Sequence, residues 1–169
     1  IMPNLKLQVS RALSVIPSSN TNIPMPNEIV SFSSITGALT TNKLIDSTKN
    51  FSSVGVNPLN VKVGDIVYNF SSSPQSAAKV VKVDSATQLT LNADIFTVVG
   101  SSYTLYSGTN IAGSIEPCVL YIGIGGDLDI ITAGGEQVML LNVPSGTFLP
   151  IQVTKVRQYG SADNIIALW

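Results

Sequence analysis

Hydrophobic and polar residues alternate along this chain in short stretches, and glycine, proline, asparagine and serine separate these stretches. No window keeps apolar residues at i, i+3, i+4 and i+7 over three helical turns, whereas a period of two is typical of strands buried on one face. The expected strands lie at residues 5–10, 60–69, 79–83, 88–91, 101–108, 118–124, 128–132, 137–143, 151–158 and 165–169. The sequence therefore predicts an all-β fold.

Changes in composition and strand spacing divide the chain into an N-terminal arm and two β regions. Residues 1–27 carry Pro17, Pro24 and Pro26 among serine and asparagine. Because proline lacks an N–H donor and fixes φ, we expect an extended arm that lies across another part of the molecule or across a neighbouring subunit. Residues 28–113 contain short strands at the spacing of a small barrel or sandwich, and residues 114–169 form the most regular part, with turn residues between successive strands.

A glycine-rich run at Gly123, Gly125 and Gly126 raises the possibility of a phosphate-binding loop. Such a loop needs G-x-G-x-x-G between a strand and a helix, but here the sixth position is Leu128 and the following residues alternate like a strand. Without a helix N-terminus there are no aligned N–H groups to hold a phosphate. We therefore expect these glycines to form tight turns.

Composition points to a protein that associates with others. Apolar residues make up 44% of the chain and charged residues only 11%, against roughly 25% in ordinary domains. A surface with so few charges protects poorly against association, so we expect an oligomer or a lattice component. The net charge of −1, spread without a basic run, argues against a nucleic-acid partner. No stretch reaches the roughly 18 apolar residues of a membrane span, and no secretory signal is expected.

Few residues offer catalytic or metal-binding chemistry. The chain has no histidine, which removes the commonest general base and zinc ligand, and its single cysteine, Cys118, has the apolar neighbours of a buried side chain. We assign no catalytic residue, no cofactor site and no metal site, and expect that the protein is not an enzyme.

The carboxylates near the glycine run have two interpretations. Asp127 and Asp129 lie two apart on an expected strand, with Glu136 across the next turn, and together they offer oxygen ligands for calcium. Solvated carboxylates that protect a strand edge are the favoured alternative, because the spacing of a calcium loop is missing. Lys155 and Arg157 share one face of a later strand, and we expect them to pair with Asp127, Asp129 or an acidic neighbouring subunit.

Two segments resemble a known family. The arm sequence SRALSVIPSSNTNIPMPN (residues 10–27) resembles the R-A-L-x-V-x-P-S-D-T-x-x-I-P-x-P arm of small tailed-phage virion proteins. Residues 120–169, with G-D, A-G-G, a V-P-x-G turn, L-P-x-x-V and the terminal I-x-A-L plus aromatic, resemble their second half. This is the pattern of the head-spike base and capsid decoration proteins of gene transfer agents and related tailed phages. The chain departs from it at Ser19 or Asn20, where the family has aspartate.

Residues 28–113 have no counterpart in the short members of that family. The resemblance thus implies two small antiparallel β-sandwich or β-barrel units, the second inserted in the first. Residues 1–27 would be an arm belonging to the C-terminal unit, residues 28–113 an inserted small β-barrel, and residues 114–169 an antiparallel β-sandwich. Insertion at a loop between paired elements is well tolerated.

The resemblance also implies a function. The chain would decorate or cement the outer surface of a bacteriophage capsid, as a spike base or cement protein without enzymatic activity. Its partners would be the major capsid protein, its own copies in a trimer or pentamer, and a fibre protein, with neither nucleic acid nor membrane. The residues expected to contact a partner are Leu13, Val15, Ile16, Ile23, Met25 and Trp169. Deletion of residues 1–27 is expected to abolish attachment while the β units stay folded.

A second hypothesis is an adhesion module of a fibre or baseplate that binds a receptor or glycan through residues 28–113. It predicts a concave patch with Tyr68, Tyr103 or Tyr106 exposed. A third, a carbohydrate-active enzyme, is the least favoured, because no pair of separated acids lies among aromatic residues.

Overall fold

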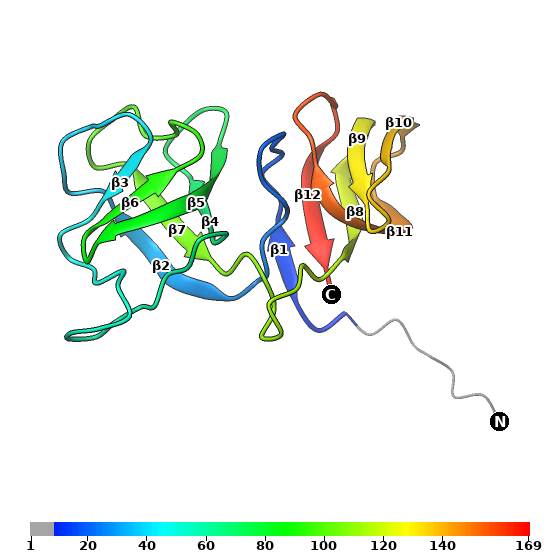
Figure 1. Ribbon diagram of the computed structural model, residues 1–169. Coiled ribbons are helices and arrows are strands. Elements are labelled where there is room, and N and C mark those ends of the chain that lie inside the picture. The colour runs from blue at the N-terminus through cyan, green and yellow to red at the C-terminus, as the bar shows by residue number, and fades with distance from the viewer. Residues whose placement is uncertain (1–8) are drawn as a thin grey trace.

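The computed structural model describes residues 9–169, which form an all-β molecule of two six-stranded antiparallel sheets. The sheets lie side by side, and the N-terminal segment runs between them (Figure 1). The predicted fold class is therefore confirmed. Most of the strand expected at residues 5–10 lies outside the described residues.

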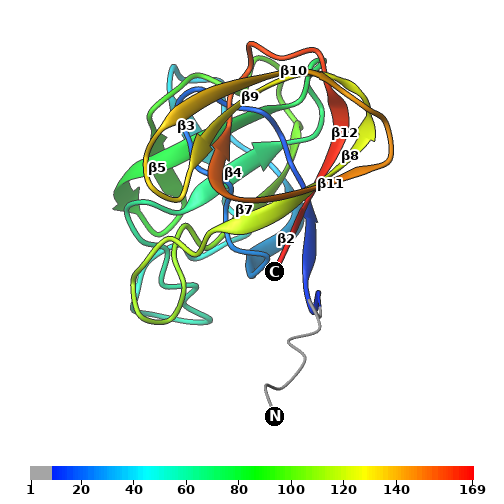
Figure 2. The ribbon, with the colours of Figure 1, turned by 90° about the vertical axis from the view of Figure 1, so that its right-hand side faces the viewer.

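The first sheet, here called the C-terminal unit, combines one N-terminal strand with the last five strands of the chain. In spatial order they are β1 (Ala12–Ser14), β12 (Asp163–Leu168), β8 (Cys118–Ile124), β11 (Thr147–Val156), β9 (Gly126–Thr132) and β10 (Gln137–Val143). The first half of β11 pairs with β8 and its second half with β9, with a register shift between Leu149 and Val153. The sheet consequently curls into a half-barrel (Figure 2) around an aliphatic core.

The second sheet, here called the inserted unit, is continuous in sequence. Its strands, in spatial order, are β2 (Glu28–Ser34), β7 (Ser102–Tyr106), β4 (Ile66–Asn69), β5 (Ser76–Ser85), β6 (Gln88–Leu91) and β3 (Lys43–Ile45). Its core contains fully buried aliphatic and aromatic side chains, among them Leu44, Phe51 and Val67. β2 and β3 are absent from the sequence expectations, because β2 is broken by two register shifts and β3 has only three residues.

The strand expected at residues 60–69 is shorter in the structure. Asn60 and Gly64 have φ angles of 53° and 105°, in the left-handed region, so the chain turns before β4 begins at Ile66. Gly64 therefore belongs to the turn that precedes the strand and forms no bulge inside it.

The arm lies across the chain's own sheets, which is one of the two positions expected from its prolines. β1 pairs with β12, and beyond it the backbone continues to bond the same unit: Val15 N donates to Ile165 O at 2.8 Å and Ile23 N donates to Thr154 O at 2.9 Å. Met25 N then donates to Ser107 O, at the end of the inserted unit, at 2.9 Å. The arm thus joins the two units through backbone hydrogen bonds.

A separate apolar cluster fills the junction between the units. Ile16 of the arm packs against Ile66, Tyr68, Ala77 and Tyr106 of the inserted unit, and all five side chains are buried. Leu13 and Phe70 border this cluster. The inserted unit therefore packs against the arm through side chains that its own core does not use.

Candidate functional site

The structure places the residues expected to contact a partner mostly in the interior. Val15, Ile16, Ile23 and Met25 are between 1% and 7% exposed. Leu13 is half-buried, and so is Trp169, whose Nε1 donates to Glu116 O at 3.1 Å. The apolar area of the arm is thus largely used within this chain, and a role for these residues in contacting a partner stays a prediction.

The three tyrosines expected to be exposed are core residues, so that part of the adhesion hypothesis is wrong. Tyr68, Tyr103 and Tyr106 are 1%, 0% and 6% exposed. Tyr68 and Tyr106 meet edge to face with ring centroids 5.2 Å apart, and burial raises the pKa of Tyr68 well above its usual range. Both faces of strands β4 and β7 are covered, because Val67, Tyr103 and Leu105 pack in the core of the inserted unit and Ile66, Tyr68 and Tyr106 pack with Ile16 of the arm.

The carboxylates near the glycine run do not converge. Asp127 Oδ1 accepts a hydrogen bond from Asn142 N at 3.0 Å, while exposed Glu136 accepts one from the Thr132 hydroxyl, which lowers the pKa of Glu136. Asp129 instead points to Arg157. Within residues 9–169 no group of three histidine, cysteine, aspartate or glutamate side chains is arranged to hold a metal ion.

Asp129, which is buried, forms an ion pair with the partly buried Arg157, one of the pairings that the strand pattern left open. Arg157 Nη1 lies 3.0 Å from Asp129 Oδ2, with side-chain exposures of 22% and 2%. Gln137 Nε2 donates to the same oxygen at 3.3 Å, and the guanidinium carbon lies 4.8 Å from the ring centroid of Tyr159. Asp129 Oδ1 has no hydrogen-bond partner among the described residues. Lys155 Nζ instead donates a hydrogen bond to the backbone oxygen of Ser19 at 3.4 Å.

The glycine run does not form the tight turns expected of it: Gly123 lies inside β8, and the chain passes through Gly125 from β8 to β9, which both run antiparallel to β11. Gly125 is the only residue between β8 and β9, and a Cβ there would lie 2.4 Å from Val143 O and 2.7 Å from Ser145 N. A Cβ on Gly123 would lie 2.8 Å from Asn164 O. These glycines are required because neighbouring backbone approaches within the space of a side chain.

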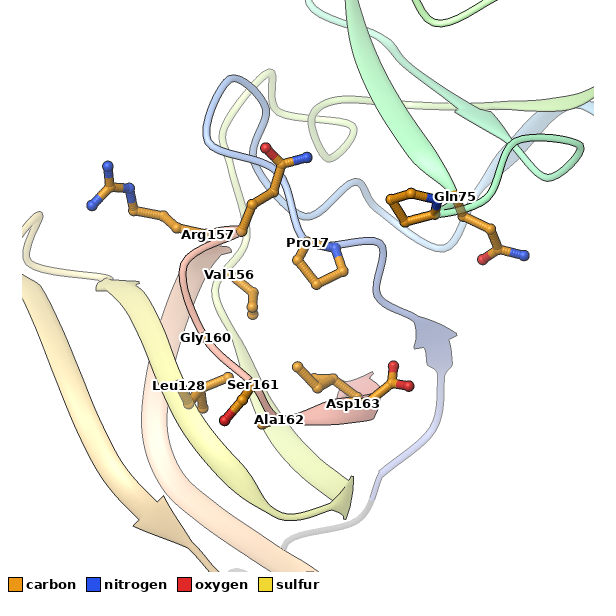
Figure 3. A pocket seen from close by; sticks show the side chains of 12 residues that line it. Pro17, Gln75, Leu128, Val156, Arg157, Gly160, Ser161, Ala162 and Asp163 are labelled. Carbon is orange, nitrogen blue, oxygen red and sulfur yellow. The ribbon is translucent and has the colours of Figure 1, made fainter.

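A cleft of about 580 Å³ lies between the arm, the inserted unit and the β11–β12 loop (Figure 3). Pro17 and Gln75 face it from one side and Ser161 and Ala162 from the other. The guanidinium of Arg157, one of the charged groups at its border, points away from the cleft in Figure 3. The cleft does not bring together a pair of groups for acid–base or nucleophilic chemistry.

The most exposed aliphatic side chains of the described residues lie on two separate loops that project toward the same end of the molecule. Val54 and Val56, in the β3–β4 loop, are 72% and 82% exposed, and Ile111, in the β7–β8 loop, is fully exposed. Both loops project from the end where the C terminus lies (Figures 1 and 2), and Leu59 and Asn60 line one surface depression together with Ile111. We call Val54, Val56 and Ile111 the apolar loop end.

Asparagine side chains hold both loop tips in place. Asn50 Nδ2 donates to Val54 O at 2.9 Å and to Val56 O at 3.0 Å. Asn110 Oδ1 accepts from Ala112 N and Ser114 N, each at 3.0 Å, on either side of the turn that presents Ile111. Such ordering reduces the conformational entropy that a partner would have to remove on binding.

No protein family model, curated protein sequence or solved structure matches this chain. No helix long and apolar enough to cross a membrane occurs within the described residues. The apolar loop end is consequently identified by its geometry, and sequence analysis missed it. The signal available in the sequence was an asparagine beside valine or isoleucine in a glycine-containing loop.

Proposed function

We propose that this chain is a structural protein of a tailed-phage virion that decorates or cements the capsid exterior, binding the major capsid protein and its own copies. The observation that carries the proposal is the apolar loop end, which presents three exposed aliphatic side chains on turns fixed by Asn50 and Asn110. The resemblance of residues 10–27 and 120–169 to head-spike base and decoration proteins favours a capsid shell as the partner.

The binding free energy expected from the apolar loop end suits attachment to a surface that many copies of the chain bind side by side. Burying a valine or isoleucine side chain contributes about 1.5–3 kcal/mol, so the apolar loop end supplies the centre of an interface and not a whole one. A specific interface buries roughly 800 Å² per partner. Copies that also contact one another on a lattice gain further affinity through multivalency.

The adhesion hypothesis is supported less well. Its aromatic platform is unavailable because Tyr68, Tyr103 and Tyr106 lie in the interior. The exposed large apolar side chains of the β3–β4 loop are valines, which offer no aromatic face for stacking on a sugar ring.

Attachment can be tested with heads of the parent phage that lack this protein. We expect the native chain to bind these heads in a co-sedimentation assay, and the double variant Val56→Lys/Ile111→Lys to bind at least about 100-fold more weakly, since two desolvated apolar contacts become charges. The matched control is Val98→Lys/Val99→Lys, which adds the same charges at positions 64% and 58% exposed in the β6–β7 loop. Cryo-EM of the particle should place both loop tips against the shell. Native-like binding by the double variant, or density for the chain inside the head, would reject the proposal.

A further inference from the structure

The edge strands of the two described sheets are β1 and β10 in the C-terminal unit and β2 and β3 in the inserted unit. An exposed edge carries unpaired N–H and C=O groups that can pair with another chain, and proteins limit this with short, charged or bulged edges. β1 and β3 have three residues each, and β3 begins with Lys43. β2 contains Glu28, two register shifts and a left-handed Phe32, with φ of 37°. Three of these edges are therefore protected.

β10 lacks all of these devices over most of its length. Its sequence, QVMLLNV, has seven residues with no charge and no proline, and it pairs with β9 without interruption from Gln137 to Leu140. The register shifts only beyond Leu140, near Asn142, whose φ is 53°. β10 lies on the side of the C-terminal unit away from the inserted unit in Figure 1, and among the described strands it pairs with β9 alone.

The side chains around this edge have the composition of an interface core. Met139 and Leu141, on the outer face of β10, are 43% and 66% exposed. Asp129 is directly opposite Met139 in the β9–β10 pair, so the Asp129–Arg157 ion pair lies on the same face as Met139. The guanidinium of Arg157 also lies over the ring of Tyr159, which is 66% exposed. Methionine, tyrosine and arginine are enriched in interfaces, whereas lysine and glutamate are depleted.

We propose that β10 pairs antiparallel with β10 of a second copy of this chain, about a twofold axis at Leu140. In this register Met139 of each copy lies opposite Leu141 of the other, so both exposed outer side chains gain an apolar cross-strand contact. A second copy is the occupant that the strand itself specifies, since an uncharged strand meets its own copy without like-charge repulsion and a twofold interface is self-complementary.

This pairing is independent of capsid attachment, because it needs no shell. It produces a dimer, unlike the trimer or pentamer that the family resemblance implies.

Charge variants at the two outer positions test both the pairing and its register. Met139→Lys/Leu141→Lys places lysine opposite lysine across the axis twice, whereas Met139→Glu/Leu141→Lys places glutamate opposite lysine twice. By sedimentation equilibrium we expect the native full chain to be a dimer and the double-lysine variant to dissociate at least about 100-fold more readily, because like charges across an interface cost several kcal/mol. The glutamate–lysine variant should recover dimerisation to within about tenfold of native.

Val98→Lys/Val99→Lys serves as the control and should dimerise as the native chain does, and circular dichroism should show that all variants are folded. Disulfide formation adds a direct readout of register: a mixture of Met139→Cys and Leu141→Cys chains should cross-link more completely than either variant alone. Cys118 does not interfere, because it is buried and burial raises the pKa of its thiol to about 12.

The pairing would be overturned by a native chain that sediments as a monomer or a trimer at about 10⁻⁴ M, a concentration high enough to populate weak complexes. Unchanged dimerisation of the double-lysine variant would also overturn it, and a glutamate–lysine variant that fails to recover would reject the Leu140-centred register. A dimer that does not bind phage heads would leave the pairing standing and reject the proposed function, so the two proposals fail separately.

Discussion

The two units of this molecule differ in how they complete their sheets, protect their edges and satisfy their buried polar groups. The inserted unit is one continuous stretch of chain, its edges are short, charged or bulged, and its buried polar groups have partners within the unit. The C-terminal unit takes one strand from a distant arm, leaves β10 as an open edge and keeps a buried carboxylate oxygen of Asp129 without a partner in the described chain. The comparison indicates that the inserted unit completes its own sheet and takes only packing on one face from the arm, whereas the C-terminal unit takes a strand of its sheet from the arm.

Asp46 illustrates how the inserted unit satisfies its polar groups. It is 0% exposed and accepts hydrogen bonds from Ser33 Oγ at 2.7 Å, Thr48 Oγ1 at 2.6 Å and Tyr103 Oη at 2.8 Å. Burial alone would raise the pKa of Asp46, but these hydrogen bonds outweigh it and the pKa lies below its ordinary value. The network joins β2, the β3–β4 loop and β7 within one unit.

Deletion of the arm should produce the largest difference in stability between the two units. Deletion of residues 1–27 takes away β1 and two arm side chains of the C-terminal core, Val15 and Ile23, each contributing about 1.5–3 kcal/mol, a sum that reaches the lower end of the roughly 5–15 kcal/mol stability of a whole domain. We expect the C-terminal unit to lose its fold while the inserted unit keeps it. Hydrogen exchange should show lost protection in β8 and β12 and retained protection in β4 and β7.

This outcome revises the expectation that both β units would survive the deletion. A milder variant makes the same point: Ile23→Ala should cost about 2–5 kcal/mol, whereas Val9→Ala, at a position 43% exposed, should change stability by less than about 0.5 kcal/mol. Full protection of β8 and β12 in the truncated chain would show that the C-terminal unit does not need its arm.

The sequence predicted the regular strands well and the irregular ones poorly. The bounds of β6, β8 and β10 match the expected ranges because apolar residues there are flanked by clear turn residues. The sequence did not predict strands β1, β2 and β3, because their pairing partners are far away in sequence. Tertiary contacts and not local alternation make these segments strands.

The candidate site was harder to predict for a related reason. The prolines of the arm correctly indicated a segment that lies across other parts of the fold, but sequence alone does not distinguish a side chain buried against its own chain from one buried against a partner. The loop tips carry no periodic pattern, and only the asparagine hydrogen bonds seen in the structure show that Val54, Val56 and Ile111 are held outward.

The buried ion pair of the C-terminal unit should have the next largest effect. Arg157→Met removes the cation from Asp129, which is 1% exposed, and leaves an uncompensated buried charge. We expect a loss of about 3–5 kcal/mol in the free energy of unfolding, measured with urea, and substantial recovery in Asp129→Leu/Arg157→Met, because an apolar pair of similar volume avoids the desolvation cost.

An exposed ion pair of the inserted unit provides the contrast. Lys82 Nζ lies 3.1 Å from Asp84 Oδ1, but the Lys82 side chain is 71% exposed, so Lys82→Met should cost at most about 1 kcal/mol. Equal losses for Arg157→Met and Lys82→Met would contradict the difference in burial on which this prediction depends.

A smaller effect than that of Arg157→Met is expected for Tyr103→Phe, and its pH dependence makes it informative. The variant removes one donor to a buried carboxylate, so it should cost about 1.5–3 kcal/mol at neutral pH. The folded-state pKa of Asp46 lies below its ordinary value, so the stabilisation from its charged form is present above the unfolded-state pKa and is lost as the pH falls through the folded-state pKa. Since the Tyr103 hydroxyl is one cause of this lowering, the difference in stability between native and variant should shrink as the pH falls below about 4. Urea titrations from pH 7 to pH 2 measure it, with Tyr121→Phe on the other unit as the control whose difference from native should not follow Asp46. A difference for Tyr103→Phe that is constant with pH would mean that the hydroxyl acts by packing alone and that Asp46 does not hold this part of the inserted unit through its charge.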